Sequence, residues 1–225
     1  MPVFQLSKKN VFPPPELAEY DGLLAIGGDL TVKRLLNAYA MGIFPWYSEG
    51  SPILWWSPDP RMILLPDELI VSRSLRQTIR KGIFHVTFDT DFEEVIKSCA
   101  SVSRKDANGT WITDEMREAY VKLHESGYAH SIESRIDGNI VGGLYGVSLG
   151  GAFFGESMFS RVSNASKVAF VSLVNMVKAW DFLFVDCQVT TEYLMSFGAR
   201  HVSRKEFMEL IDKALLMPAH KGRWT

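Results

Sequence analysis

This 225-residue sequence has few cysteines and a small net charge. Cys99 and Cys187 are its only cysteines, and the formal net charge at pH 7 is −2. Two thiols cannot make a disulfide scaffold, so we expect both to be reduced and the protein to be cytoplasmic. A chain so close to neutral is not a bulk polyanion binder, and any nucleic-acid contact must come from a local basic patch.

Long hydrophobic runs are missing as well. No apolar run approaches the roughly 20 residues that a membrane-spanning helix needs, and no charged segment followed by an apolar one opens the chain as in a signal peptide. With 47% hydrophobic and 22% charged residues, the chain has enough apolar surface to fold as a globular protein. We therefore expect no membrane contact.

The common catalytic and metal-binding motifs are also absent. The sequence contains no Cys-x-x-Cys, no His-Glu-x-x-His and no EF-hand loop, so no metal site is predicted. It has neither a P-loop nor a dinucleotide fingerprint. The segment 155–159 has a serine near a glycine but lacks the second glycine of a nucleophile elbow. No cofactor is predicted.

Proline and tryptophan concentrate in the first sixty residues, which predicts a loop-rich segment with one helix over Thr31–Met41. Beyond a boundary near Pro60–Pro66, the patterns become regular and mixed. We expect a small N-terminal domain over residues 1–62 and a larger domain over residues 63–225, in an α+β (mixed α/β) fold.

The larger domain carries clear helix and strand signals. Thr90-x-x-Glu93 and Ser203-x-x-Glu206 are capping boxes, and Thr113 is a further helix start. Residues 139–148 and 152–159 flank Gly150-Gly151 and predict a hairpin. Residues 166–180 are apolar on nearly all sides and predict a buried helix, and residues 182–189 predict a buried strand after it.

A basic patch follows the predicted domain boundary. Arg73, Arg76 and Arg80 share one face of a helix over residues 72–82, with Lys81 beside them and no acid in the segment. A solvated surface helix would have this pattern. So would a cation stripe for phosphates, in which each contact adds salt-dependent affinity without sequence information.

Polar residues interrupt two of the apolar strands. Glu156 should share a strand face with Phe154 and Met158, where it either pairs with Arg161 or faces a mostly apolar pocket. Asp186 and Gln188 stand two apart, so a regular strand points both to the same face, as an active-site rim or as a buried polar network. Cys187, between them, is expected to be a buried structural thiol.

A set of ordered motifs runs through most of the chain: Gly22-Leu-Leu-Ala-Ile-Gly-Gly-Asp-Leu30, Gly42-Ile-Phe-Pro-Trp46, Trp55-Trp-Ser-Pro-Asp-Pro-Arg61, Gly109-Thr-Trp-Ile-Thr113, His130-Ser-Ile-Glu133, Gly142-Gly-Leu-Tyr-Gly146, Gly155-Glu-Ser-Met-Phe-Ser-Arg161, Asn164-Ala-Ser-Lys167 and Asp186-Cys-Gln188. Together these motifs resemble the leucyl/phenylalanyl-tRNA–protein transferase family over roughly residues 4–215. The stretch 175–184 and the tail after Met217 depart most from the family pattern.

The resemblance implies a fold and a reaction. It implies that the larger domain has the fold of the acetyltransferase superfamily (GNAT-like). It also implies an enzyme that transfers Leu or Phe, and Met less well, from Leu-tRNA, Phe-tRNA or Met-tRNA. The acceptor would be the N-terminal Arg or Lys of a protein, which is thereby tagged for degradation by the N-degron pathway. We expect a monomer that needs no cofactor.

The resemblance also implies site residues. Glu156, Asp186 and Gln188 would line the reaction centre, and Tyr39, Trp46 and Trp111 would contact the 3′ adenosine. Arg73, Arg76, Arg80 and Lys81 would contact the acceptor stem. The apolar pocket for the transferred side chain would be formed by Leu144, Phe153, Met158, Phe170, Leu173, Val177 and Val185.

Elementary chemistry refines these roles. Aromatic faces bind a splayed base by stacking. An aminoacyl ester is already activated, so aminolysis needs placement and a stabilised oxyanion more than a strong base. Because an amide does not titrate, we assign Gln188 to orienting the amine, Asp186 to fixing Gln188, and Glu156 to attracting the amine or the acceptor's cationic side chain. The tRNA ribose hydroxyl could carry the proton.

Two other functions fit the same residues. An acyl-CoA N-acetyltransferase would share the implied fold, but the segment 135–140 fails the usual pyrophosphate-binding pattern at its last position. A noncatalytic tRNA-binding module would make Glu156 and Gln188 structural. The Glu156→Ala protein would then bind tRNA with no reaction to lose.

Overall fold

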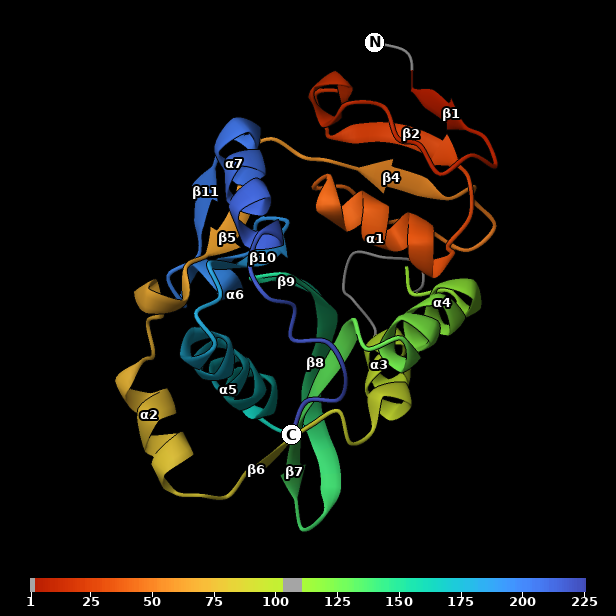
Figure 1. Cartoon of the computed structure of the whole chain (residues 1–225). Helices are drawn as coiled ribbons and strands as arrows, with labels where there is room; N and C mark the ends of the chain where they lie inside the picture. The colour runs from red at the N-terminus through yellow and green to blue at the C-terminus, as the bar shows by residue number, and fades with distance from the viewer. Residues whose placement is uncertain (1–2, 103–110) are drawn as a thin grey trace.

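The computed structural model describes residues 3–102 and 111–225. Its strands form two sheets, one from residues 4–56 and one from residues 61–202, which lie one above the other in Figure 1. The mixed α/β class with a small N-terminal unit is thus confirmed. None of the described helices is long and apolar enough to cross a membrane.

The N-terminal sheet has the strand order β1-β2-β4-β3, with only β1 and β2 parallel. Its strands are β1 (Phe4–Leu6), β2 (Leu23–Gly27), β3 (Phe44–Pro45) and β4 (Leu54–Trp56). Helix α1 (Val32–Ala40) lies within the predicted range 31–41, and of the two candidate caps Asp29 and Thr31 it is the Thr31 side chain that accepts a hydrogen bond from the Arg34 backbone. The helix buries Leu35 and Tyr39 toward the larger domain.

The larger sheet has seven strands in the order β11-β5-β10-β9-β8-β7-β6. They are β5 (Arg61–Leu64), β6 (His85–Phe88), β7 (Ala129–Ile136), β8 (Asn139–Leu149), β9 (Ala152–Ser160), β10 (Phe184–Gln188) and β11 (Arg200–Val202). The predicted hairpin is β8–β9. Only β9 and β10 are parallel, and helix α5 (Ala165–Ala179) connects them.

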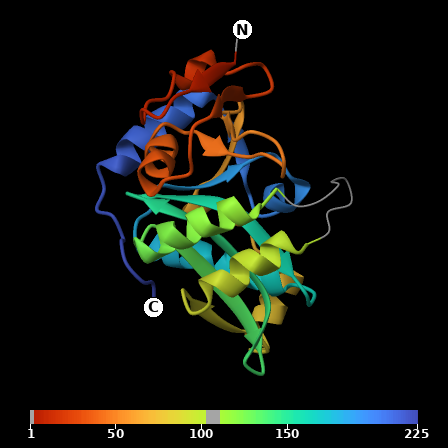
Figure 2. The ribbon, with the colours of Figure 1, turned by 90° about the vertical axis from the view of Figure 1, so that its right-hand side faces the viewer.

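Helices cover both faces of this sheet (Figure 2). Helices α3 (Phe92–Ala100) and α4 (Asp114–Glu125) pack on one face, while α2 (Arg73–Arg80) and α5 lie on the other. The chain is completed by α6 (Glu192–Met195), α7 (Arg204–Leu215) and the 3-10 turns Pro15–Leu17 and Pro66–Glu68. The apolar core on the α3–α4 face continues without a break into the N-terminal unit.

The predicted helix starts hold with one exception. Thr113 and Ser203 cap α4 and α7 by accepting hydrogen bonds from backbone nitrogens three residues on. The Thr90 capping box is wrong, because α3 begins after Asp91 and the Thr90 hydroxyl donates instead to the buried Glu133 carboxylate, 2.8 Å away. A long-range hydrogen bond thus takes the place of the local cap.

Candidate active site

A cavity of about 600 Å³ lies between strands β8, β9 and β10 and helices α5 and α6. Its origin is the parallel pair β9–β10: within the described residues, this pairing ends at Phe154 and Asp186, although β9 runs on to Ser160. Beyond that point the two strands separate and leave their side chains facing a common space. The wall of this space is mostly apolar and carries a few polar groups, as is usual for a small-molecule site.

Most of the predicted side-chain pocket lines this cavity. The residues found on its wall are Leu144, Phe153, Met158, Phe170, Leu173 and Val185. Val177 is the exception: it is fully buried one turn further along α5, in the core between that helix and the sheet, and does not reach the cavity. The sequence could not fix how far along α5 the cavity extends.

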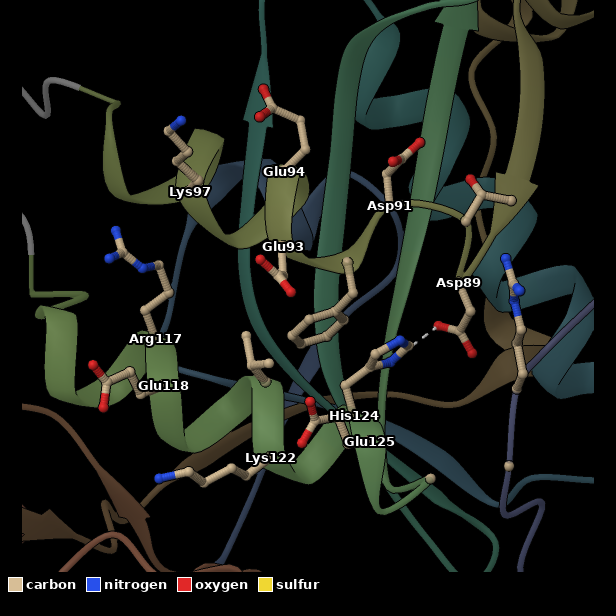
Figure 3. Close-up of a pocket in the computed structure, with 16 residues that line it drawn as sticks. Asp89, Asp91, Glu93, Glu94, Lys97, Arg117, Glu118, Lys122, His124 and Glu125 are labelled. Atoms are coloured by element: carbon tan, nitrogen blue, oxygen red, sulfur yellow. Dashed lines mark ion pairs between the residues drawn. The ribbon is translucent and has the colours of Figure 1, made fainter.

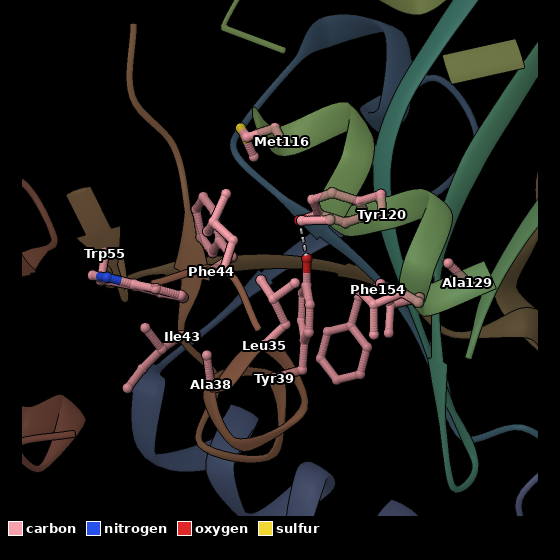
Figure 4. Close-up of a cluster of buried hydrophobic side chains, with 14 of the residues drawn as sticks. Leu35, Ala38, Tyr39, Ile43, Phe44, Trp55, Met116, Tyr120, Ala129 and Phe154 are labelled. Atoms are coloured by element: carbon pink, nitrogen blue, oxygen red, sulfur yellow. Dashed lines mark hydrogen bonds between the residues drawn. The ribbon is translucent and has the colours of Figure 1, made fainter. Parts of the chain in front are cut away.

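Glu156 forms the polar centre of the site. Its Oε1 accepts hydrogen bonds from the Tyr39 hydroxyl (2.8 Å) and from Nε2 of Gln188 (2.7 Å), and its Oε2 accepts one from the Tyr120 hydroxyl (3.0 Å). The hydroxyls of Tyr39 and Tyr120 also bond to each other (Figure 4). Each tyrosine has a single hydroxyl proton, so the two hydroxyls cannot both donate to Glu156 and also donate to each other.

Burial dominates the titration of this cluster. It raises the pKa of Glu156 from its ordinary 4.5 to about 7, and the nearby Asp186 charge adds to the increase while the three hydrogen bonds oppose it. Burial also raises the pKa of Tyr39 and of Tyr120 well above the ordinary value, and the Glu156 charge contributes. Both tyrosines therefore remain protonated donors, while Glu156 changes charge near neutral pH.

A β-bulge brings Glu156 to this position. Gly155 pairs with Gly146 and Ser157 with Tyr145, so Glu156 is the extra residue on β9. The bulge reverses the alternation, and Phe154 and Met158 lie on opposite faces of the sheet instead of sharing one. The predicted common face is therefore wrong.

The alternative pairing of Glu156 with Arg161 is wrong too. The Arg161 guanidinium lies 3.1 Å from the Glu94 carboxylate and 2.8 Å from the Ser98 hydroxyl, both on α3. The Glu156 carboxylate is instead held by two tyrosines and an amide, and no cation among the described residues pairs with it to offset the burial that raises its pKa.

Arg61 binds Asp186, the second acidic residue of the site. Its Nε and Nη2 lie 2.9 and 2.7 Å from the two oxygens of the fully buried Asp186, in a bidentate pair. The guanidinium lies between the rings of Phe44 and Phe207, at 4.7 and 4.6 Å from their centroids, and donates to the Gly42 carbonyl. Sequence reasoning gave Arg61 no role, since its partner lies 125 positions away.

Asp186 in turn fixes Gln188. Its Oδ1 accepts a hydrogen bond from the Gln188 backbone nitrogen at 2.9 Å, across a second bulge where Gln188 has φ +57°. The strand pairing is therefore irregular between Asp186 and Gln188, and the Asp186 carboxylate binds Arg61 while the Gln188 amide donates to Glu156. Cys187, between them, is buried on the cavity wall, and burial raises the pKa of its thiol, in keeping with a structural role.

The three aromatic residues predicted for the adenosine have different surroundings. Trp46 is 42% exposed and packs beside Trp56, so part of the residue is accessible from outside. Trp111 is half-buried just before α4. Tyr39 has no exposed surface and its ring packs on Phe154, so a base cannot stack on it in this conformation.

The basic patch forms the expected surface helix. Arg73, Arg76, Arg80 and Lys81 are all exposed on α2 or just after it, while Leu75 is buried beneath them. Among the described residues, no carboxylate forms an ion pair with these four cations. Their charges are thus available to an outside anion.

Two family models match nearly this whole framework. The model described as "Leucyl/phenylalanyl-tRNA protein transferase" matches residues 63–212, and that of its N-terminal domain matches residues 28–59. This chain belongs to the leucyl/phenylalanyl-tRNA–protein transferase family. All the predicted site residues fall within the two matched regions.

Curated relatives in this transferase family are similar over the full chain. The protein from Myxococcus xanthus is 55% identical over 100% of this chain and 97% of its own length. The protein from Syntrophus aciditrophicus is 56% identical over 100% of this chain and 94% of its own length. Both are named leucyl/phenylalanyl-tRNA–protein transferase.

Solved structures outside the transferase family are only remotely similar. L-PGS from Bacillus licheniformis has a TM-score of 0.40 at 12% identity, covering 69% of this chain and 50% of its own. A GCN5-related N-acetyltransferase from Kribbella flavida has a TM-score of 0.37 at 11% identity, covering 74% and 59%. Scores at this level support no conclusion about this chain.

A second hollow, of about 1230 Å³, lies between α3 and α4 (Figure 3). Acidic and basic side chains mix on its wall, with Glu93 and Glu118 near Lys97 and Arg117, and His124 lies 3.9 Å from Asp89. None of the transferase site residues predicted from the sequence lines it. Among the described residues, no cluster of His, Cys, Asp or Glu has a metal-binding arrangement.

Proposed function

We propose that this protein transfers leucine or phenylalanine, and methionine less well, from tRNA to the N-terminal Arg or Lys of proteins, which tags them for degradation by the N-degron pathway. The observation that carries the proposal is the Glu156–Gln188 pair on the wall of a mostly apolar cavity, in a chain of this family. A cytoplasmic location and a monomeric state belong to the same proposal. Both cysteines are buried, and so small a number of cysteines fits a reducing compartment.

The cavity receives the transferred side chain. An apolar cavity of about 600 Å³ is large enough for Leu, Phe or Met. Its wall offers no polar partner along the stretch formed by Leu144, Phe153 and Leu173, so a polar side chain would lose its hydrogen bonds to water on entry. The cavity discriminates less strongly between apolar side chains of different size, because one methylene changes the rate by only roughly 10–200-fold.

Gln188 orients the attacking amine. Its amide nitrogen is occupied by the Glu156 carboxylate, so its carbonyl oxygen is the group left to accept a hydrogen bond from the amine. Asp186 holds the Gln188 backbone, and Arg61 holds Asp186. The reaction centre therefore depends on a continuous chain of buried contacts that keeps one amide oxygen in place.

The chemical step is an aminolysis. The neutral amine attacks the ester carbonyl, a new C–N bond forms, and the C–O bond to the tRNA ribose breaks. The amine loses one proton and the departing ribose oxygen gains one, and we assign its transfer to the neighbouring ribose hydroxyl. Ionised Glu156 holds Gln188 and places negative charge beside the incoming cationic N-terminus, so the rate should fall as pH drops below about 7.

The tRNA contacts extend away from the cavity. Trp46 and Trp111 are proposed to bind the 3′ adenosine by stacking, and the partial exposure of Trp46 supports this. Tyr39 serves the same region by holding Glu156. The four cations on and beside α2 are proposed to meet acceptor-stem phosphates, since they are exposed and unpaired by the described carboxylates.

The test mixes the purified protein with Phe-tRNA and a peptide beginning with Arg, without CoA, and follows peptide mass. Addition of one Phe to this peptide, with none to a Gly-starting control, is expected. Gln188→Ala should lower kcat at least tenfold, whereas Glu192→Gln, which removes an exposed carboxylate on α6, should not. If Phe-tRNA binds and no peptide gains mass, the tRNA-binding module replaces this proposal. Addition that requires an acyl-CoA donor would identify an acetyltransferase.

A further inference from the structure

The tail after α7 returns across the molecule to the far side of the cavity wall. In Figure 1 it runs in dark blue from α7 down toward strands β6 and β7. Its residue Trp224 is 3% exposed and belongs to the same apolar core as Phe153 and helix α5. The family match ends at residue 212, so this tail lies outside it.

Three contacts fix Trp224 in place. Its backbone nitrogen donates to Oδ2 of the buried Asp89 at 2.7 Å, and its ring nitrogen donates to the His220 carbonyl at 3.0 Å. The indole stacks on His130, with ring centroids 3.8 Å apart and planes only 10° from parallel. His130 is itself bonded to Asp89 at 2.8 Å. The indole is therefore held by both polar and stacking contacts.

The same indole packs against the cavity wall. The ring centroids of Trp224 and Phe153 are 5.8 Å apart, and Phe153 is fully buried and lines the cavity. The Phe153 ring also lies close to Gly146 on β8, where an added Cβ would lie 2.6 Å from it. Phe153 is thus in contact with both the β8 backbone and the indole while it lines the cavity.

We propose that Trp224 is a specificity-determining positioning residue: by holding the Phe153 ring, it sets the depth of the cavity that takes the transferred side chain. The inference rests on the proposed function. A smaller residue at position 224 would leave space behind Phe153, and because cores relax only partly around such space, the ring would gain room to move back. A longer side chain could then enter.

The experiment compares kcat/KM for two tRNAs of the same sequence, one charged with leucine and the other with O-methyltyrosine. In Trp224→Leu, the O-methyltyrosine/leucine ratio should rise at least fivefold. Trp224→Phe restores a ring against Phe153 and should return the ratio to within twofold of the parent. Both rates come from one preparation, so a change in the amount of folded protein cancels in the ratio.

Two further variants separate this role from simple anchoring of the tail. Lys221→Ala removes the contact of the Lys221 ammonium with the Tyr128 ring, 4.7 Å away, and should leave the ratio unchanged. In a Phe153→Leu background, adding Trp224→Leu should change the ratio by less than twofold, because the ring through which Trp224 acts is gone.

An unchanged ratio in Trp224→Leu, or an equal change in Lys221→Ala, would overturn the inference. Should Trp224→Leu not fold, the Phe153→Leu protein decides: a ratio equal to the parent's would show that the Phe153 ring does not limit the cavity. A parent protein that transfers neither amino acid would overturn the proposed function itself, which is a separate outcome.

Discussion

Replacing Glu156 by glutamine should make the stability difference from the parent protein depend on pH. Burial raises the pKa of Glu156 from 4.5 to about 7, so between these values the folded protein binds a proton that the unfolded chain releases. The stabilisation that comes from this bound proton is complete below pH 4.5, declines above that value, and is lost once the pH has risen through 7. Each pKa unit corresponds to about 1.4 kcal/mol, so the loss amounts to about 3 kcal/mol.

The measurement is the free energy of unfolding in urea at pH 5 and pH 8.5 for both proteins. The substituted amide would not titrate, and any constant cost of fitting it against Tyr39, Tyr120 and Gln188 is the same at both pH values. Part of the loss has already occurred at pH 5, which lies above 4.5, so relative to the parent Glu156→Gln should gain about 2–3 kcal/mol between the two conditions. Glu192→Gln, which removes an exposed carboxylate on α6, is the matched control. A difference between parent and Glu156→Gln that does not change with pH would refute the argument that burial governs this carboxylate.

Three further predictions follow from the same geometry. Arg61→Met should lower the free energy of unfolding by about 3–5 kcal/mol in chemical denaturation, since it leaves the buried Asp186 charge without a partner; a loss below about 1 kcal/mol would contradict the pairing. Replacing Arg76 and Arg80 together by glutamine should make the log–log dependence of tRNA affinity on salt less steep by about 2, and an unchanged slope would remove α2 from the tRNA interface. Leu173→Phe partly fills the cavity and should lower kcat/KM for Phe-tRNA relative to Leu-tRNA about tenfold; an unchanged ratio would place the side chain elsewhere.

Several features of this protein follow from the sequence alone. Thr31, Thr113 and Ser203 begin helices because a cap acts over three residues, and no distant contact is needed to form it. The paired glycines at 150 and 151 predict the hairpin for the same reason. The mostly apolar residues of 166–180 predict helix α5, which buries one side and exposes Asn175 and Lys178 on the other. The ordered motifs gave the family, which the two family models confirm.

The tertiary structure decided how the site is assembled. The Arg61–Asp186 pair joins residues 125 positions apart, and no local pattern encodes that choice of partner. The bulge at Glu156 reverses side-chain direction along β9, because one extra residue shifts the residues after it to the other face of the sheet. Tyr39 has an aromatic ring of the kind that stacks on bases, but in the folded protein the ring is fully buried and its hydroxyl donates to the Glu156 carboxylate. Local hydrogen bonding and hydrophobic periodicity thus determined the elements, while strand register and core packing, which depend on the whole chain, determined which side chains meet.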